Sequence, residues 1–197
     1  RHFYDRKKGW VVLMILTGMI LLTALPAMAS IAKVTSFKGE VIVASGGQVD
    51  KVTAPGLVLK SGDIVQTKDG EVQIAFNDGA VMKVNPFTKT MIQEAKEQKG
   101  TWLFKTTEKA RRVTCYVGKL WFKSGASGTK NYLQSPTAVA GLRGSDGDLG
   151  YDPARLVTLL NMYSGEAAVV GNVIRGFFES PGASAAQKSA VYQKLEQ

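Results

Sequence analysis

The fold is decided by residues 71–84, which read EVQIAF at 71–76, NDG at 77–79 and AVMKV at 80–84. Apolar and polar residues alternate in the first segment, which places Val72, Ile74 and Phe76 on one face of a β-strand. The dipeptide Asp78-Gly79 supplies the positive φ angles of a tight hairpin turn. The stretch therefore predicts a β-hairpin whose apolar face carries Phe76 into the core.

Short segments of the same kind, separated by turn residues, run from about residue 31 to residue 170. Such spacing is typical of an all-β domain, built from short antiparallel hairpins into a sandwich, a barrel or a β-solenoid-like fold. Turns are expected at 45–47, 61–63, 68–70 and 124–125, where glycine and aspartate recur. Besides the two strands of the hairpin, strands are predicted at 33–44, 63–67, 88–93, 101–105, 113–123, 131–134, 138–142 and 157–170.

The first 29 residues have the order of a secretory signal peptide. Four basic residues within 1–8 precede an apolar run at 10–25, and AMA at 27–29 resembles a cleavage site. The run of 16 residues is shorter than the roughly 20 that a bilayer core requires. We expect a signal helix cleaved after Ala29 and a periplasmic or cell-surface protein, with a retained inner-membrane anchor as the alternative.

The remaining chain divides into a β-domain at 30–171 and a C-terminal tail at 172–197. The tail is rich in alanine, glutamine and lysine after a Ser-Pro-Gly break at 180–182, and it is expected to be partly helical. Val191 and Leu195 lie four residues apart, which would align them on one helix face. No fixed-period repeat is present.

The charge balance is basic, with 25 Lys and Arg against 16 Asp and Glu and a net charge of +9. The basic residues are spread singly along the predicted strands, and the longest cluster is Lys109, Arg111 and Arg112. This spread indicates a solvated basic surface and argues against a nucleic-acid site. The only cysteine, Cys115, lies in the alternating segment 113–117 and is predicted to be a buried, inert thiol.

Residues for catalysis, cofactor binding or metal ligation are not predicted. The only histidine, His2, lies in the segment expected to be removed, which excludes a Ser-His-Asp triad and histidine metal ligands. The run RGSDGDLGYD at 143–152 carries three carboxylates but lacks the glutamate of an EF-hand calcium loop. We interpret it as a flexible loop, and if the segment were extended we expect Asp146 and Asp148 on opposite faces.

Partner binding is predicted for one strand face and one turn arginine. Trp121 shares a period-two face with Lys119 and Lys123, while Leu120 and Phe122 take the other face. An exposed aromatic edged by positive charge suits a sugar ring or the apolar anchor of a partner protein. Trp102 and Tyr132 also lie in strand-like segments near these lysines and Lys130 and are further candidates for such a face, although burial of all three rings in the core would explain them as well. Arg143 is the second candidate, although an exposed turn arginine or an internal ion pair would explain it as well.

An ordered series of segments resembles the FecR domain family of envelope proteins. The matching segments are GEV at 39–41, LKSGDIVQT at 59–67, VQIAFNDG at 72–79, VNP at 84–86, VGKLW at 117–121, SPTAVAGLRGS at 135–145, VT at 157–158 and SGEAAV at 164–169. The resemblance implies a β-rich envelope domain that belongs either to a membrane-spanning regulator or to a secreted interaction module. Here Ser145 stands where the family commonly has threonine, and Gly147 interrupts the strand expected next, so that strand is expected to start near Leu156.

These observations predict an exported envelope binding module of FecR type that engages a protein or polysaccharide partner without catalysis. The alternative is a single-span signal-transduction regulator of the anti-sigma type, whose cytoplasmic segment is missing from this chain. Only nine residues precede the apolar run, which is too few to bind a sigma factor.

Overall fold

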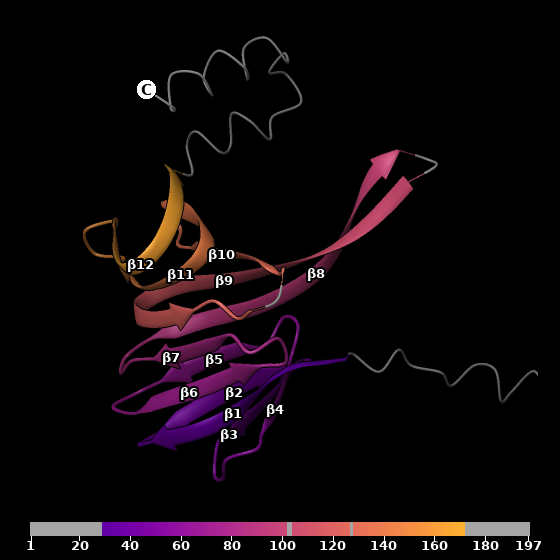
Figure 1. Ribbon diagram of the computed structural model, residues 1–197. Helices are drawn as coiled ribbons and strands as arrows, with labels where there is room; N and C mark the ends of the chain where they lie inside the picture. The colour runs from indigo at the N-terminus through magenta and orange to yellow at the C-terminus, as the bar shows by residue number, and fades with distance from the viewer. Residues whose placement is uncertain (1–28, 102–103, 127, 172–197) are drawn as a thin grey trace, which may run out of the picture.

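The computed structural model describes residues 29–101, 104–126 and 128–171 (Figure 1), and these form one curled sheet of twelve strands with no helix among them. The all-β prediction is therefore confirmed, whereas the expected signal helix and C-terminal helix lie outside the described residues. The strands are β1 Ser30–Lys38, β2 Val41–Ser45, β3 Gln48–Lys51, β4 Val58–Lys60, β5 Ile64–Thr67, β6 Glu71–Phe76, β7 Val81–Val84, β8 Lys89–Thr101, β9 Phe104–Lys123, β10 Lys130–Gln134, β11 Ala138–Asp152 and β12 Val157–Gly171.

The predicted hairpin is β6 and β7. Ile74 lies opposite Met82 in an antiparallel register, and Val72, Ile74 and Phe76 are all buried. The turn itself differs from the expected two-residue type. It spans residues 77–80, and only Gly79 has a positive φ there, of 85°. The carboxylate of Asp78 accepts a hydrogen bond from the Ala80 amide at 3.1 Å instead of adopting such an angle itself.

Strand β9 is the central strand of the sheet and pairs with four of the other described strands. On one side its residues 104–117 pair with β8 and its residues 120–123 pair with β7. Gly118, with φ of 89°, lies where β9 passes from one neighbour to the other, and a Cβ there would come within 2.7 Å of the Phe87 carbonyl oxygen. On its other side β9 pairs with β10 and then with β11. The β9–β10 pairing is parallel, so the sheet is not wholly antiparallel.

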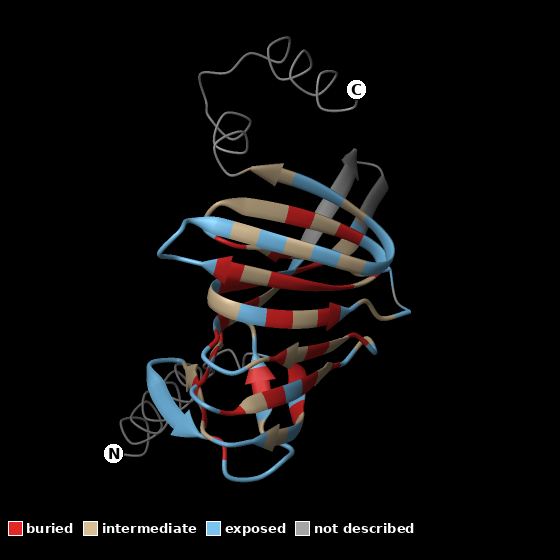
Figure 2. Ribbon diagram, turned by 90° about the vertical axis from the view of Figure 1, so that its left-hand side faces the viewer, coloured by how far each residue is buried: buried red, intermediate tan, exposed pale blue. Residues whose placement is uncertain are grey.

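The N-terminal strands curl around the main core. The turn after β4 bonds to the middle of β8, since the Gly62 amide donates to the Ile92 carbonyl at 2.8 Å and the Ile92 amide donates to Asp63 at 3.0 Å. Buried and exposed residues alternate along these strands (Figure 2). The largest fully buried apolar side chains are those of Phe122, Leu59, Ile74, Met82, Ile92, Leu120, Leu133 and Leu149.

The prediction of a loop at residues 143–152 is wrong, because β11 continues through these residues to Asp152 and pairs with β12. The glycines of this segment allow close packing against β12 and form part of a β-bulge. A Cβ on Gly147 would lie 2.5 Å from the Asn161 carbonyl oxygen on β12, so glycine permits the two strands to approach. At the bulge, the Ser145 hydroxyl donates to the Glu166 carbonyl at 2.6 Å and accepts the Arg143 amide at 3.1 Å. Side-chain bonds thus replace the ladder bonds that the bulge interrupts.

Other differences concern strand ends. The expected strand at 33–44 is two strands, β1 and β2, separated at Gly39, where φ is 70°. The short strands β3 and β4 were not predicted, and β8 and β9 are longer than the predicted segments at 88–93 and 113–123. The predicted strand at 101–105 lies partly outside the described residues and otherwise falls at the tip of the β8–β9 hairpin.

Candidate functional site

The predicted face of β9 is built as expected. Leu120 and Phe122 are fully buried, whereas Lys119 and Lys123 are exposed and Trp121 is half-buried between them. The inward pair anchors the strand in the core and leaves the other three side chains on the outer face of the sheet. This outer face, defined here by Lys119, Trp121 and Lys123 of β9 together with the outward residues of β11 and β12, is the first candidate site.

Carboxylates of β11 line this face beside Trp121. The Trp121 indole N–H donates to Asp146 Oδ1 at 2.5 Å, and in the strand register Trp121 lies directly opposite Asp148. Asp146 and Asp148 are two residues apart on one strand and therefore share this face, contrary to the opposite placement expected from the sequence. The indole ring is thus fixed by its polar edge.

Asp148 holds a second aromatic residue on the outer face. Its carboxylate is 5% exposed, lies 2.6 Å from the Lys119 ammonium and accepts a hydrogen bond from the Tyr163 hydroxyl at 2.5 Å. The hydrogen bond to Asp148 raises the pKa of Lys119 and that of Tyr163, because the carboxylate favours the protonated partner in each case. The Tyr163 residue itself is 62% exposed on β12, so its ring remains available to solvent.

The other two predicted residues lie at the margin of this group. Lys123 is exposed, and its strand partners are Val81 on β7 and Asp146 on β11. Arg143 is exposed at the β11 bulge, opposite Glu166 of β12, three residues before Asp146. Sequence reasoning missed Asp146, Asp148 and Tyr163. The alternation of Leu149 and Tyr151 with the aspartates was the signal that this segment is a strand.

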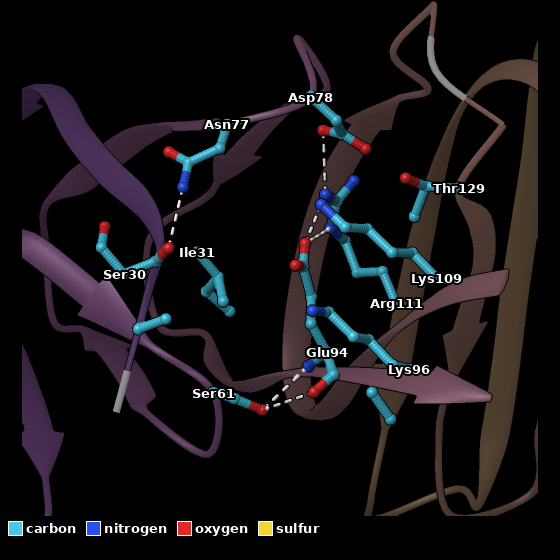
Figure 3. A pocket seen from close by; sticks show the side chains of 12 residues that line it. Ser30, Ile31, Ser61, Asn77, Asp78, Glu94, Lys96, Lys109, Arg111 and Thr129 are labelled. Atoms are coloured by element: carbon cyan, nitrogen blue, oxygen red, sulfur yellow. Dashed lines mark hydrogen bonds and ion pairs between the residues drawn. The ribbon is translucent and has the colours of Figure 1, made fainter. Parts of the chain in front are cut away.

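A second candidate site is a cavity of about 380 Å³ between the start of β1, the β6–β7 turn and the β8–β9 pair (Figure 3). The side chain at its centre is that of Arg111, which is 1% exposed. The guanidinium lies 2.8 Å from the Asp78 carboxylate and 2.5 Å from that of Glu94, and it donates to Asn131 Oδ1 at 3.1 Å. Arg111 was expected on a solvated basic surface, and that prediction is wrong, because its side chain is buried while its neighbour Arg112 is exposed.

The carboxylate of Asp78 belongs to this buried network. Burial alone would raise the pKa of Asp78, but the hydrogen bonds from Arg111 and from the Ala80 amide outweigh it and hold the pKa below its ordinary value of 3.8. Lys96 and Lys109 lie opposite each other across the β8–β9 pair and also line the cavity. Because Arg111 already bonds two carboxylates and an amide, the network primarily joins the β6–β7 hairpin to β8 and β9.

No family model, curated protein or solved structure matches the chain. Among the residues that the structure describes, no helix has the length and hydropathy to span a bilayer, and no three histidine, cysteine, aspartate or glutamate side chains are grouped to hold a metal ion. The buried Cys115 thiol has its pKa raised to about 11 by burial, as suits an inert core residue.

Proposed function

We propose that this chain is an exported binding module of the cell envelope, of FecR type, which engages an envelope polysaccharide through the outer face without catalysis. The observation that carries the proposal is the pair of aromatic side chains, Trp121 and Tyr163, whose polar tips are bonded to Asp146 and Asp148. Rings fixed in this way offer apolar area to a sugar at little entropic cost.

The polar groups between the rings suit a hydroxyl-rich ligand. A carboxylate has about four acceptor sites, so Asp146 retains capacity beyond the bond to Trp121, whereas Asp148 is 5% exposed and already bonded by Lys119 and Tyr163. Lys119 and Lys123 add donors at the same face. Alternating acceptors, donors and aromatic faces match the hydroxyls and the apolar ring faces of a glycan better than they match a uniformly apolar protein surface.

Cleavage after Ala29 is compatible with the strands that the structure describes. The first strand starts at Ser30, the residue after the expected cleavage site, and the Ser30 carbonyl accepts a hydrogen bond from the Asn77 side chain at 2.8 Å. The Asn77 backbone amide also donates a hydrogen bond to the carbonyl of the following residue, Ile31, at 3.0 Å. A chain cut after Ala29 would therefore retain every strand of the sheet. The anti-sigma regulator remains the alternative, and it differs in keeping the N-terminal segment in the membrane.

The test is co-sedimentation of the protein with purified peptidoglycan sacculi. We expect the wild type to sediment with sacculi, and Trp121→Ala to lower its affinity about tenfold or more while leaving the circular dichroism spectrum unchanged. Phe87→Ala is the matched control, because Phe87 is an aromatic residue 70% exposed in the turn after β7 and outside the outer face. Equal binding by the wild type and Trp121→Ala, or no binding by either, would refute the polysaccharide proposal.

A further inference from the structure

The last strand, β12, is a long edge of the sheet. Its 15 residues pair with β11 alone among the described strands, which leaves its other backbone edge without a strand partner there. Edge strands in monomeric proteins are commonly short, or they carry lysine or proline that blocks further pairing. The other two ends of the sheet follow that rule, since β3 has four residues, including Asp50 and Lys51, and β4 has three.

The β12 edge lacks these protections, although a β-bulge at Tyr163 interrupts its pairing with β11, where Met162 and Ser164 lie opposite successive residues of that strand. Its sequence, VTLLNMYSGEAAVVG, contains neither lysine nor proline, and Glu166 is its only charged residue. Large apolar or aromatic side chains are exposed on it and in the turn before it: Leu156, Val157, Leu159, Tyr163 and Val169. Leu159 is 65% exposed. An exposed apolar edge of this length is a template for another strand.

We propose that the occupant of this edge is β12 of a second copy of the chain, paired antiparallel about a two-fold axis at Asn161. The segment is self-complementary in this register. On the outer face Leu159 would lie opposite Tyr163 of the second copy, and Asn161 opposite its own counterpart, while on the inner face Leu160 would lie opposite Met162. A two-fold pairing repeats each of these contacts twice and closes the assembly at a dimer.

Charges agree with this register. No charged residue falls within 157–165, so the two copies bring no like charges together along the paired strands. Just beyond it, Glu166 would lie near the turn that carries Arg155 and Leu156 of the second copy. Arg155 is largely exposed, and its contact with Asp152 is long, at 3.7 Å. Opposite charges would therefore meet at both ends of the paired segment.

The dimer would join the two outer faces into one continuous sheet surface, because Tyr163 belongs both to that face and to the paired strand. A glycan chain could then contact two copies of the Trp121 cluster at once, which raises avidity without any new contact. The pairing itself depends only on β12. It does not rest on the polysaccharide proposal, and Trp121 is not part of it.

The test uses cysteine cross-linking in the full chain. Residues opposite each other in an antiparallel pair have Cα atoms about 4.5–5.5 Å apart, within the reach of a disulfide. We expect Asn161→Cys to form a disulfide-linked dimer under mild oxidation. The native Cys115 is fully buried and should not compete. The matched control is Val49→Cys on the β3 edge, where the residue is 68% exposed, and it should remain monomeric.

A second variant tests the dimer independently, in case Asn161→Cys fails to fold. Leu159→Lys places a charge on the edge without touching the core, so we expect it to fold as the wild type does and to lower the sedimenting mass from two chains to one. Trp121→Ala should remain dimeric, which separates this inference from the glycan-binding proposal. Two results would overturn the pairing: a wild type that sediments as a monomer at every concentration, or equal cross-linking of Asn161→Cys and Val49→Cys. The occupant of the β12 edge would then be residues 172–197 or another protein.

Discussion

The guanidinium carbon of Arg111 lies 3.9 Å from the centre of the Phe76 ring, so a buried cation of β9 rests on the last residue of β6. The same ring meets Phe122 edge to face, with centroids 6.1 Å apart. Phe76 therefore joins the apolar core to the ion network of Arg111, Glu94 and Asp78. The cation–π contact partly replaces the water that a buried guanidinium loses.

Replacing Phe76 should be among the most damaging single changes in the core. We expect Phe76→Ala to lower the free energy of unfolding by about 3–5 kcal/mol, because it leaves a cavity and removes the ring beneath Arg111. Phe76→Leu keeps most of the volume and should cost less, about 1–2 kcal/mol. Urea denaturation measures both. A Phe76→Ala protein as stable as the wild type would contradict the packing described here.

The Asp78 carboxylate should make stability depend on acid pH. Because its pKa is lowered in the folded state, its contribution is complete above the ordinary value of 3.8 and is lost as the pH falls through the lower folded-state value. Asp78→Asn should cost about 1–3 kcal/mol at neutral pH by weakening the bond to buried Arg111. Its free energy of unfolding should then change less than that of the wild type between about pH 4 and pH 2. Parallel acid dependence in both proteins would exclude Asp78 as the titrating group.

Processing at Ala29 distinguishes the binding module from the membrane regulator. The basic, apolar and AMA order of residues 1–29 predicts that the mature protein starts at Ser30. N-terminal sequencing of protein recovered from the envelope of an expressing bacterium measures this. Recovery of the uncleaved chain from the inner membrane would favour the anti-sigma alternative instead.

The sequence predicted those parts of the fold that depend on local alternation. The β6–β7 hairpin and the two faces of β9 around Trp121 follow from period-two patterns, and the structure confirms both. The segment 143–152 was misread because glycine signals a turn locally. At Gly147 glycine is needed instead for close contact with Asn161 of β12, which lies far along the chain.

The ion network of Arg111, Glu94 and Asp78 could not be predicted from the sequence either, because its contacts join residues that are far apart along the chain. Asp78 fits a turn residue, and Arg111 fits a surface cluster with Lys109 and Arg112, as long as only neighbours in sequence are considered. Their contact joins residues 33 positions apart and depends on the β6–β7 turn lying beside the β8–β9 pair. The aromatic cluster was predicted in part. Trp121 stood out on its strand, whereas the carboxylates that hold Trp121 and Tyr163, Asp146 and Asp148, belong to a strand that the sequence did not reveal.

The most direct measurement of the central claim is an NMR titration of the mature chain with soluble glycan fragments released from peptidoglycan sacculi. The account predicts that the indole N–H resonance of Trp121 and the backbone amides around Asp148 and Tyr163 shift progressively with ligand, while amides lining the Arg111 cavity stay in place. Shifts confined to other regions, or no shift of the Trp121 indole at saturating glycan, would contradict the assignment of the outer face as the polysaccharide site.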